Sequence, residues 1–466
     1  MELPPNEKPN ELINKFELML KTDDVYFFDS EDFEEIIHYY LNQGKVALGK
    51  KAIDIGLQQY PNSTELKLLY VEVLVFENHF SEAEAILDEL HEIDDSNDEI
   101  YIQRANILSK KDDHQGAVEL LLQALETTDD SFEIYSLMGM EHLFLDHFDA
   151  AKQCFIKCLE NDPSDYASLY NIVYCFEFLK DFDGAIEYLN TYLEYHPYSE
   201  VGWHQLGMMY HAKNMHTEAL AAFDFAIISD DSFIGAYFEK GKILEKLGKL
   251  NEAIACYETT ISMDDPTAHA YLRIGKCHEK LGNDDFAKHH YFKAVHEDPQ
   301  LDKGWLAIAD FYYRLKDFKE ASIYINKALN IDGENPTYWK KSGEIFQVLK
   351  NYHEADFSYK QAIELGNYEI DTWQNWAFTL SKLHDFESAT QVLMQGIEFY
   401  PDNTQLLFQL AGMHLKNKNK ICAKQILDQL LPLSPSNAML FLKLYPEFAT
   451  TKWVQDCIKA SKKASI

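Results

Sequence analysis

Two pairs of residues carry side chains that could hold a metal ion. His278-Glu279 begins like a zinc-binding helical motif, in which a second histidine follows the first by four residues. Here that position holds Gly282, so a required ligand is missing. Cys154 and Cys158 lie four apart on one helix face, but two thiols are too few for zinc and no second pair follows. We therefore predict no metal site.

The chain also lacks the usual motifs for phosphate binding and acyl transfer. It contains no glycine-rich phosphate loop and no G-x-S-x-G nucleophile turn. Its seven cysteines are an odd number scattered along 466 residues, which argues against a disulfide framework and favours a reducing compartment. We expect a cytoplasmic protein that is not an enzyme and needs no cofactor.

Charge is distributed unevenly along the chain. The formal net charge is −35, and residues 1–200 hold 43 acids but only 13 bases. Such a balance repels phosphate backbones, so we expect no nucleic acid as a partner. The acidic half either forms a solvated surface or steers a basic partner. No run of about 18 apolar residues is present, so we expect no membrane span.

The elements that carry these residues repeat with a fixed period. Counted from Ser30, units of 34 residues follow one another twelve times and fill residues 30–437 without an insertion. The twentieth residue of every unit is small, which allows two helices to approach closely. These residues are Gly49, Ala83, Ala117, Ala151, Ala185, Ala219, Ala253, Ala287, Ala321, Ala355, Ala389 and Ala423.

Apolar spacing inside a unit predicts two helices. In the unit that begins at Glu200, apolar residues recur along one helix face and, after a polar turn, along a second. They are Trp203, Leu206, Gly207 and Tyr210, then Ala219, Phe223 and Ala226. The pattern W-x2-L-G-x2-Y followed by A-x3-F resembles the tetratricopeptide repeat, and the resemblance covers residues 30–437.

This resemblance implies an all-α fold, a right-handed superhelical solenoid of antiparallel helix pairs. In the family the first helix of each pair lines a concave groove, and members are chiefly scaffolds and peptide receptors. The eighth position is glycine in five units but bulky at Ile37, Val71 and Val173, where we expect wider helix spacing or a local change of curvature.

Positions 2, 5, 6, 9 and 12 of a unit usually face the groove in this family. No unit carries the lysine, asparagine and arginine set with which some members clamp a chaperone's C-terminal carboxylates. A central basic cluster falls at or beside such positions: Lys242, His269, Arg273, Lys276 and Lys303. It could receive an acidic segment, or its lysines could pair with glutamates on their own helices.

A second candidate surface lies in the late units, where amides could bond an extended backbone and phenylalanines could supply apolar contact. Its residues are Gln374, Asn375, Phe378, Phe408 and Gln409.

The two ends of the chain fall outside the repeats. Residues 1–29 are expected to include a capping helix from about Asn10 to Met19, and residues 438–466 to form capping helices. We expect a scaffold or adaptor that binds peptide segments or helices of one or more proteins. The alternative is a structural subunit of a large assembly that uses its convex face or its ends, and self-association through end repeats stays open.

Overall fold

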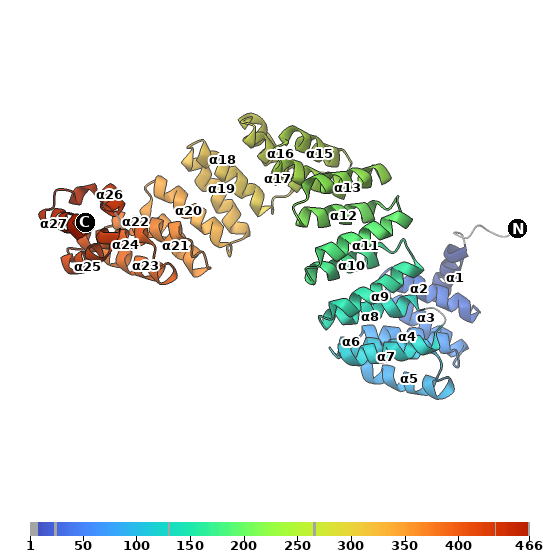
Figure 1. The fold of residues 1–466 in the computed structure, drawn as a ribbon. Coiled ribbons are helices and arrows are strands. Elements are labelled where there is room, and N and C mark those ends of the chain that lie inside the picture. Colours follow the sequence, from blue (N-terminus) through green and yellow to red (C-terminus); the bar gives the residue numbers. More distant parts are fainter. Residues whose placement is uncertain (1–7, 23–25, 129–130, 264–266, 434, 465–466) are drawn as a thin grey trace. The chain divides into compact units, whose positions relative to one another are not determined.

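A computed structural model describes residues 8–22, 26–128, 131–263, 267–433 and 435–464. These residues form helices and turns and contain no strand, which confirms the predicted all-α class. Their contacts group into two compact units, Met1–Asp231 and Ser232–Ile466. Within each, consecutive helices lie side by side as antiparallel pairs (Figure 1).

The first helix of each pair begins at the residue where a 34-residue unit begins. In the first compact unit these helices are α2 (Ser30–Asn42), α4 (Thr64–Phe76), α6 (Asp98–Lys110), α8 (Phe132–Phe144), α10 (Tyr166–Phe178) and α12 (Glu200–Ala212). In the second they are α14 (Ile234–Lys246), α16 (Ala268–Lys280), α18 (Asp302–Arg314), α20 (Pro336–Val348), α22 (Ile370–Lys382) and α24 (Thr404–Lys416).

The second helices follow after a turn of three residues. They are α3 (Val46–Gln59), α5 (Phe80–Ile93), α7 (His114–Thr127), α9 (Phe148–Asn161), α11 (Phe182–Tyr195), α13 (His216–Ser229), α15 (Leu250–Ser262), α17 (Asp284–Glu297), α19 (Phe318–Ile331), α21 (Tyr352–Glu364), α23 (Phe386–Phe399) and α25 (Lys420–Leu430).

The turn inside each pair is built around a residue with left-handed backbone. In every unit the fifteenth residue has positive φ, for example Asn78 at 65° and Gly248 at 77°. The residue after it donates its N–H to a carbonyl five residues earlier, as His79 does to Leu74 at 2.8 Å. This is the bond that ends a helix in a Schellman motif, so the turn stops the first helix at a fixed place.

The eighth and twenty-fourth positions share the space between the two helices of a pair. Where the eighth residue is glycine, an aromatic ring lies against it: a Cβ added to Gly207 would come within 2.7 Å of the Phe223 ring. The five such pairs are Gly139–Phe155, Gly207–Phe223, Gly241–Tyr257, Gly275–Tyr291 and Gly343–Tyr359.

The other seven units divide the same space differently, with a larger eighth residue and an aliphatic twenty-fourth, all of them buried. The pairs are Ile37–Ile53, Val71–Leu87, Ala105–Leu121, Val173–Leu189, Ala309–Ile325, Ala377–Leu393 and Ala411–Leu427. The bulky residues that suggested wider spacing are thus matched by a facing residue smaller than an aromatic ring.

Aromatic residues at the fourth position tie a unit to the one before it. The Trp203 indole donates to the carbonyl of Pro197 at 2.8 Å, and Trp305 donates to Pro299 at 2.9 Å. The Tyr101 hydroxyl reaches Asp95 in the same way at 3.0 Å. In these three bonds the acceptor is the thirty-second residue of the preceding unit, so the bonds fix the register of the stack.

Further helices lie at both ends of the chain. Before the repeats, α1 (Lys8–Thr22) buries Phe16 and Met19 against the first pair. After them come the short helix η1 (Leu431–Leu433), α26 (Pro435–Leu444), η2 (Pro446–Phe448) and α27 (Lys452–Ala464). In α27, Val454 and Cys457 are buried against the last units. The division into residues 1–29, 30–437 and 438–466 stays a prediction.

Candidate partner-binding surface

Positions two, five, six and nine of the first helices form one face, here called the inner face. In the first compact unit this face is hollowed by a cavity of about 510 Å³, the acidic cavity. Its lining residues all belong to α2, α4, α6 and α8 and all stand at those four positions. They are Glu34, His38, Glu65, Leu68, Leu69, Glu72, Glu99, Gln103, Asn106 and Glu133.

The carboxylates of the acidic cavity are crowded. Burial raises the pKa of Glu99, and the neighbouring charge of Glu133 adds to this effect, while a hydrogen bond from Gln103 opposes it. Partial desolvation by neighbouring protein atoms also raises the pKa of Glu72, and the charge of His38 opposes this effect. Ionisation of these groups therefore costs more here than it would in water.

A second cavity, of about 530 Å³, follows along the inner face and is mostly apolar. We call it the aromatic cavity, and α8, α10 and α12 line it. Phe144, Tyr170 and Tyr174 expose their rings there. Large exposed apolar surface rimmed by polar groups is typical of a protein contact. The helix α8 lines both cavities, since it contributes Glu133 to the first and Met140 to the second.

The predicted central basic cluster lies in the second compact unit and is partly neutralised. Arg273 binds Glu245 at 3.2 Å, and Lys280 binds the other oxygen of the same carboxylate at 2.8 Å. Burial alone would raise the pKa of Glu245, but the two cations outweigh it and the pKa is lowered. Lys242 pairs with Glu239 on its own helix at 2.8 Å.

The other three members of the central basic cluster are Lys276, His269 and Lys303. Lys276 is half-buried, and its pKa is lowered by burial and by the positive charge of Arg273. His269 and Lys303 are exposed. Whether these residues act together on a partner stays a prediction.

The late surface differs from its prediction at one residue. Phe408 has no exposed surface and packs on Phe441 of α26, with ring centroids 5.7 Å apart. The helix α26 continues the stack and covers this side of α24, so Phe408 belongs to the core and is not available to a partner. Gln374 and Gln409 each keep one buried amide atom without a hydrogen-bond partner.

Asn375 and Phe378 complete the late surface. Asn375 is half-buried on α22, and Phe378 exposes 42% of its surface one turn further along the same helix. Together with the two glutamines they leave a small polar and apolar face, and its role in binding stays a prediction.

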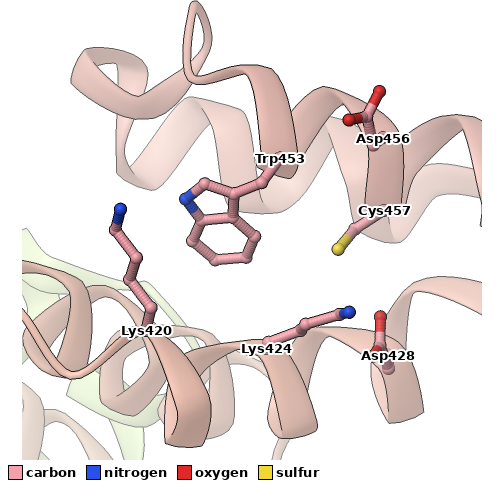
Figure 2. Close-up of a pocket in the computed structure, with 6 residues that line it drawn as sticks. All are labelled: Lys420, Lys424, Asp428, Trp453, Asp456 and Cys457. Atoms are coloured by element: carbon pink, nitrogen blue, oxygen red, sulfur yellow. The ribbon is translucent and has the colours of Figure 1, made fainter.

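A third cavity lies where α27 packs on α25. Figure 2 shows this space of about 690 Å³, lined by Lys420, Lys424, Asp428, Trp453, Asp456 and Cys457. Burial raises the pKa of the Cys457 thiol, and Asp428 adds to the effect, so the thiol stays protonated and unreactive near neutral pH. The two lysines balance the two aspartates, and the space is a seam between helices.

The described part of the chain has neither a metal-binding cluster nor a membrane-spanning helix. No group of three or more histidine, cysteine, aspartate or glutamate side chains there could hold a metal ion. Within the same residues, no helix combines the length and the apolar character needed to cross a membrane.

The sequence does contain a signal for the acidic cavity. Four consecutive units carry glutamate at their second position: Glu31, Glu65, Glu99 and Glu133. Equivalent positions of stacked first helices lie on one face, so three of these carboxylates meet in the cavity. A search for basic residues at inner-face positions overlooks this row.

Comparisons with solved structures return other helical-repeat proteins. The Cut9–Hcn1 hetero-tetramer of APC/C is 16% identical over 88% of this chain and 94% of that chain, with a TM-score of 0.41. Yeast Tom70 is 15% identical over 93% and 95%, with a TM-score of 0.39. MamA is 26% identical over 37% and 94%, with a TM-score of 0.32. Scores of this size carry no argument about partners.

Family models described as tetratricopeptide repeat match residues 98–130, 132–165, 167–199, 234–266 and 302–335. No curated protein matches the chain. The matched segments start at or one residue after the first residue of α6, α8, α10, α14 and α18. Because they fall in the register of the helix pairs, these five segments of the chain are tetratricopeptide repeats.

Proposed function

We propose that this protein is a non-catalytic scaffold that holds segments or helices of partner proteins against the inner face of its first helices. Its repeats support a protein-interaction or assembly role in general. The single observation that carries the finer proposal is that first helices alone line both the acidic and the aromatic cavity.

The two cavities suit a bound protein segment better than a small molecule. Each is an open hollow across several parallel helices, and the exposed rings of Tyr170 and Tyr174 offer broad apolar contact. Exposed aromatic anchors beside polar groups are the usual centre of a protein interface. The array over residues 30–437, flanked by the end segments 1–29 and 438–466, would present this face.

A crosslinking experiment tests the position of the partner. A photoreactive benzoylphenylalanine replaces Tyr170 on the inner face or, as a matched control, Tyr195 at the end of α11, which is 77% exposed. The intact chain is irradiated in native cell extract, and crosslinked proteins are identified by mass spectrometry. We expect one set of proteins from position 170 and none of them from position 195.

The reverse pattern would favour the structural-subunit alternative, in which other faces or the ends make the contact. Crosslinking of the chain to itself from both positions would indicate self-association instead. The seven cysteines, an odd number scattered along the chain, support a cytoplasmic location. Labelling them in intact cells with a membrane-permeant but not an impermeant maleimide tests that location.

The central basic cluster is proposed as a second, weaker site for an acidic segment. Its test is the variant Arg273→Glu/Lys276→Glu, with Lys276→Gln as a milder change that preserves the Arg273–Glu245 pair. Loss of a captured partner by both variants supports this site. Full retention by both removes it.

A further inference from the structure

The acidic cavity carries negative charge that the protein does not neutralise. Five carboxylates line it, and His38 is the one lining residue that can become positive. Among the described residues, none of these five glutamates forms an ion pair with lysine or arginine. Burial is the main cause of the raised pKa values of Glu72 and Glu99, and the charge of Glu133 contributes to both.

Cations on the same helices bind elsewhere. Lys67 on α4 pairs with Glu89 at 2.7 Å, and Arg104 on α6 pairs with Glu84 and Asp88. Neither cation lines the acidic cavity. The carboxylates of the acidic cavity therefore remain open to a positively charged group of another molecule.

Gln103 gives a second, independent sign of a missing ligand. This side chain is only 5% exposed and lines the acidic cavity. Its amide nitrogen donates to Glu99 at 2.7 Å, which leaves its amide oxygen buried with no hydrogen-bond partner. A buried acceptor without a donor costs about 1–3 kcal/mol unless something supplies the bond. The missing group is therefore a hydrogen-bond donor.

We propose that the acidic cavity binds a basic segment of a partner protein, whose lysine or arginine side chains enter between Glu72, Glu99 and Glu133 and donate to the free oxygen of Gln103. This inference rests on the proposed scaffold function and names its partner's chemistry. Ammonium and guanidinium groups supply both the positive charge and the donors that these acceptors require.

The aromatic cavity distinguishes a protein segment from a small polyamine. Glu133 and Met140 are seven residues apart on α8, which is about 10 Å along a helix. An extended chain covers that distance in about three residues. The favoured ligand is therefore a segment with basic residues about three positions away from apolar ones, because a polyamine has no large apolar group to pack on the aromatic rings.

The test uses the full chain and three labelled 16-residue peptides. The first peptide carries four lysines, a three-residue serine and glycine spacer, and then leucine and phenylalanine. The second replaces its lysines by glutamate, and the third replaces its apolar residues by serine. Fluorescence anisotropy gives Kd at low and at physiological salt. We expect the first peptide to bind most tightly, the third at least threefold more weakly, and the second not at all.

Matched variants locate the binding. Glu72→Gln/Glu99→Gln removes two charges from the acidic cavity and keeps the side-chain size, while Glu92→Gln/Glu126→Gln removes two exposed charges from α5 and α7. The cavity variant should weaken binding of the first peptide at least tenfold, about 1.4 kcal/mol, and the control variant less than twofold. Gln103→Leu, which keeps every charge, should also weaken binding.

Three results would overturn the proposal. The first is that the glutamate peptide binds as tightly as the lysine peptide. The second is that both cavity variants keep native helicity by circular dichroism and bind the lysine peptide with unchanged affinity. The third is that spermidine displaces the lysine peptide and the protein does not distinguish the first peptide from the third. The last would indicate a polyamine site. Because crosslinking from position 170 does not depend on these peptides, the scaffold function can stand while this inference fails.

Discussion

Gly207→Ala tests the division of space between the two helices of a pair. The new Cβ would lie 2.7–2.9 Å from three atoms of the Phe223 ring. Carbon atoms in contact prefer about 3.5–4.0 Å, so the ring must move by roughly 1 Å although it has no exposed surface. Overpacking of this kind costs about 1–3 kcal/mol, while alanine gains about 1 kcal/mol over glycine in a helix. We expect a net loss near 1 kcal/mol.

Hydrogen exchange is the suitable assay, because a repeat array with two compact units need not unfold in one step. A loss of 1 kcal/mol should make the amides of α12 and α13 exchange about fivefold faster, with distant units unchanged. Phe223→Leu should suppress this effect, because the double variant reproduces the Ala105–Leu121 pair of another unit. The coupling between the two substitutions should reach about 1 kcal/mol.

Slower exchange in Gly207→Ala alone, together with additive effects in the double variant, would refute this reasoning. Helix propensity would then outweigh the contact with the ring, and the glycine would have no packing role.

Four further predictions concern other features. Tyr101→Phe deletes the hydroxyl that donates to the carbonyl of Asp95 and should lower local stability by about 0.5–1.5 kcal/mol. The amides at the start of α6 should then exchange faster. Exchange at the wild-type rate would contradict a role of this bond in register. Gly282→Ala places a side chain at a φ of 78° with nothing within 4 Å of its Cβ, so only backbone strain changes. The free energy of unfolding, measured in urea, should fall by about 1 kcal/mol. An unchanged free energy would contradict that strain. Because burial raises the pKa of Glu99 in the folded state, the free protein should gain stability as pH falls from neutral through that pKa. Glu99→Gln should remove this gain, and at pH 7 the variant should be more stable by about 0.5 kcal/mol and melt at a higher temperature. A lower melting temperature would contradict this sign. Over the same pH range the lysine peptide should lose affinity, because Glu72 and Glu99, which share the acidic cavity with Glu34, Glu65, Glu133 and His38, become neutral. Binding that does not depend on pH would contradict the role of these charges.

The period of the sequence predicts the fold well, because residues of similar size or character recur at the key positions for a physical reason. The small twentieth residue, the aromatic fourth residue and the 34-residue spacing place every first helix where it begins. The pairing of the eighth with the twenty-fourth residue is also written in the sequence. It becomes visible only when the two positions are compared across all units.

Positions predict sites less well than they predict helices. Phe408 has an inner-face position, yet a following helix covers it, and that depends on how the chain continues after the repeats. Arg273 pairs with Glu245 from the preceding unit, a contact that depends on side-chain reach and that repeat positions alone do not predict. The acidic cavity is recognised when separated glutamates are placed on one face and their counter-charges are traced.

The two kinds of helix contact also constrain how such a chain can evolve. A glycine–aromatic pair and an alanine–leucine pair fill the same space, but two substitutions separate them. Changing the glycine first forces a methyl group into the ring, whereas changing the ring first leaves a void of about a methyl group or two, which a core tolerates more readily. The passable order is therefore to shrink the ring and then enlarge the glycine, so a sequence caught midway should carry glycine facing leucine rather than alanine facing phenylalanine.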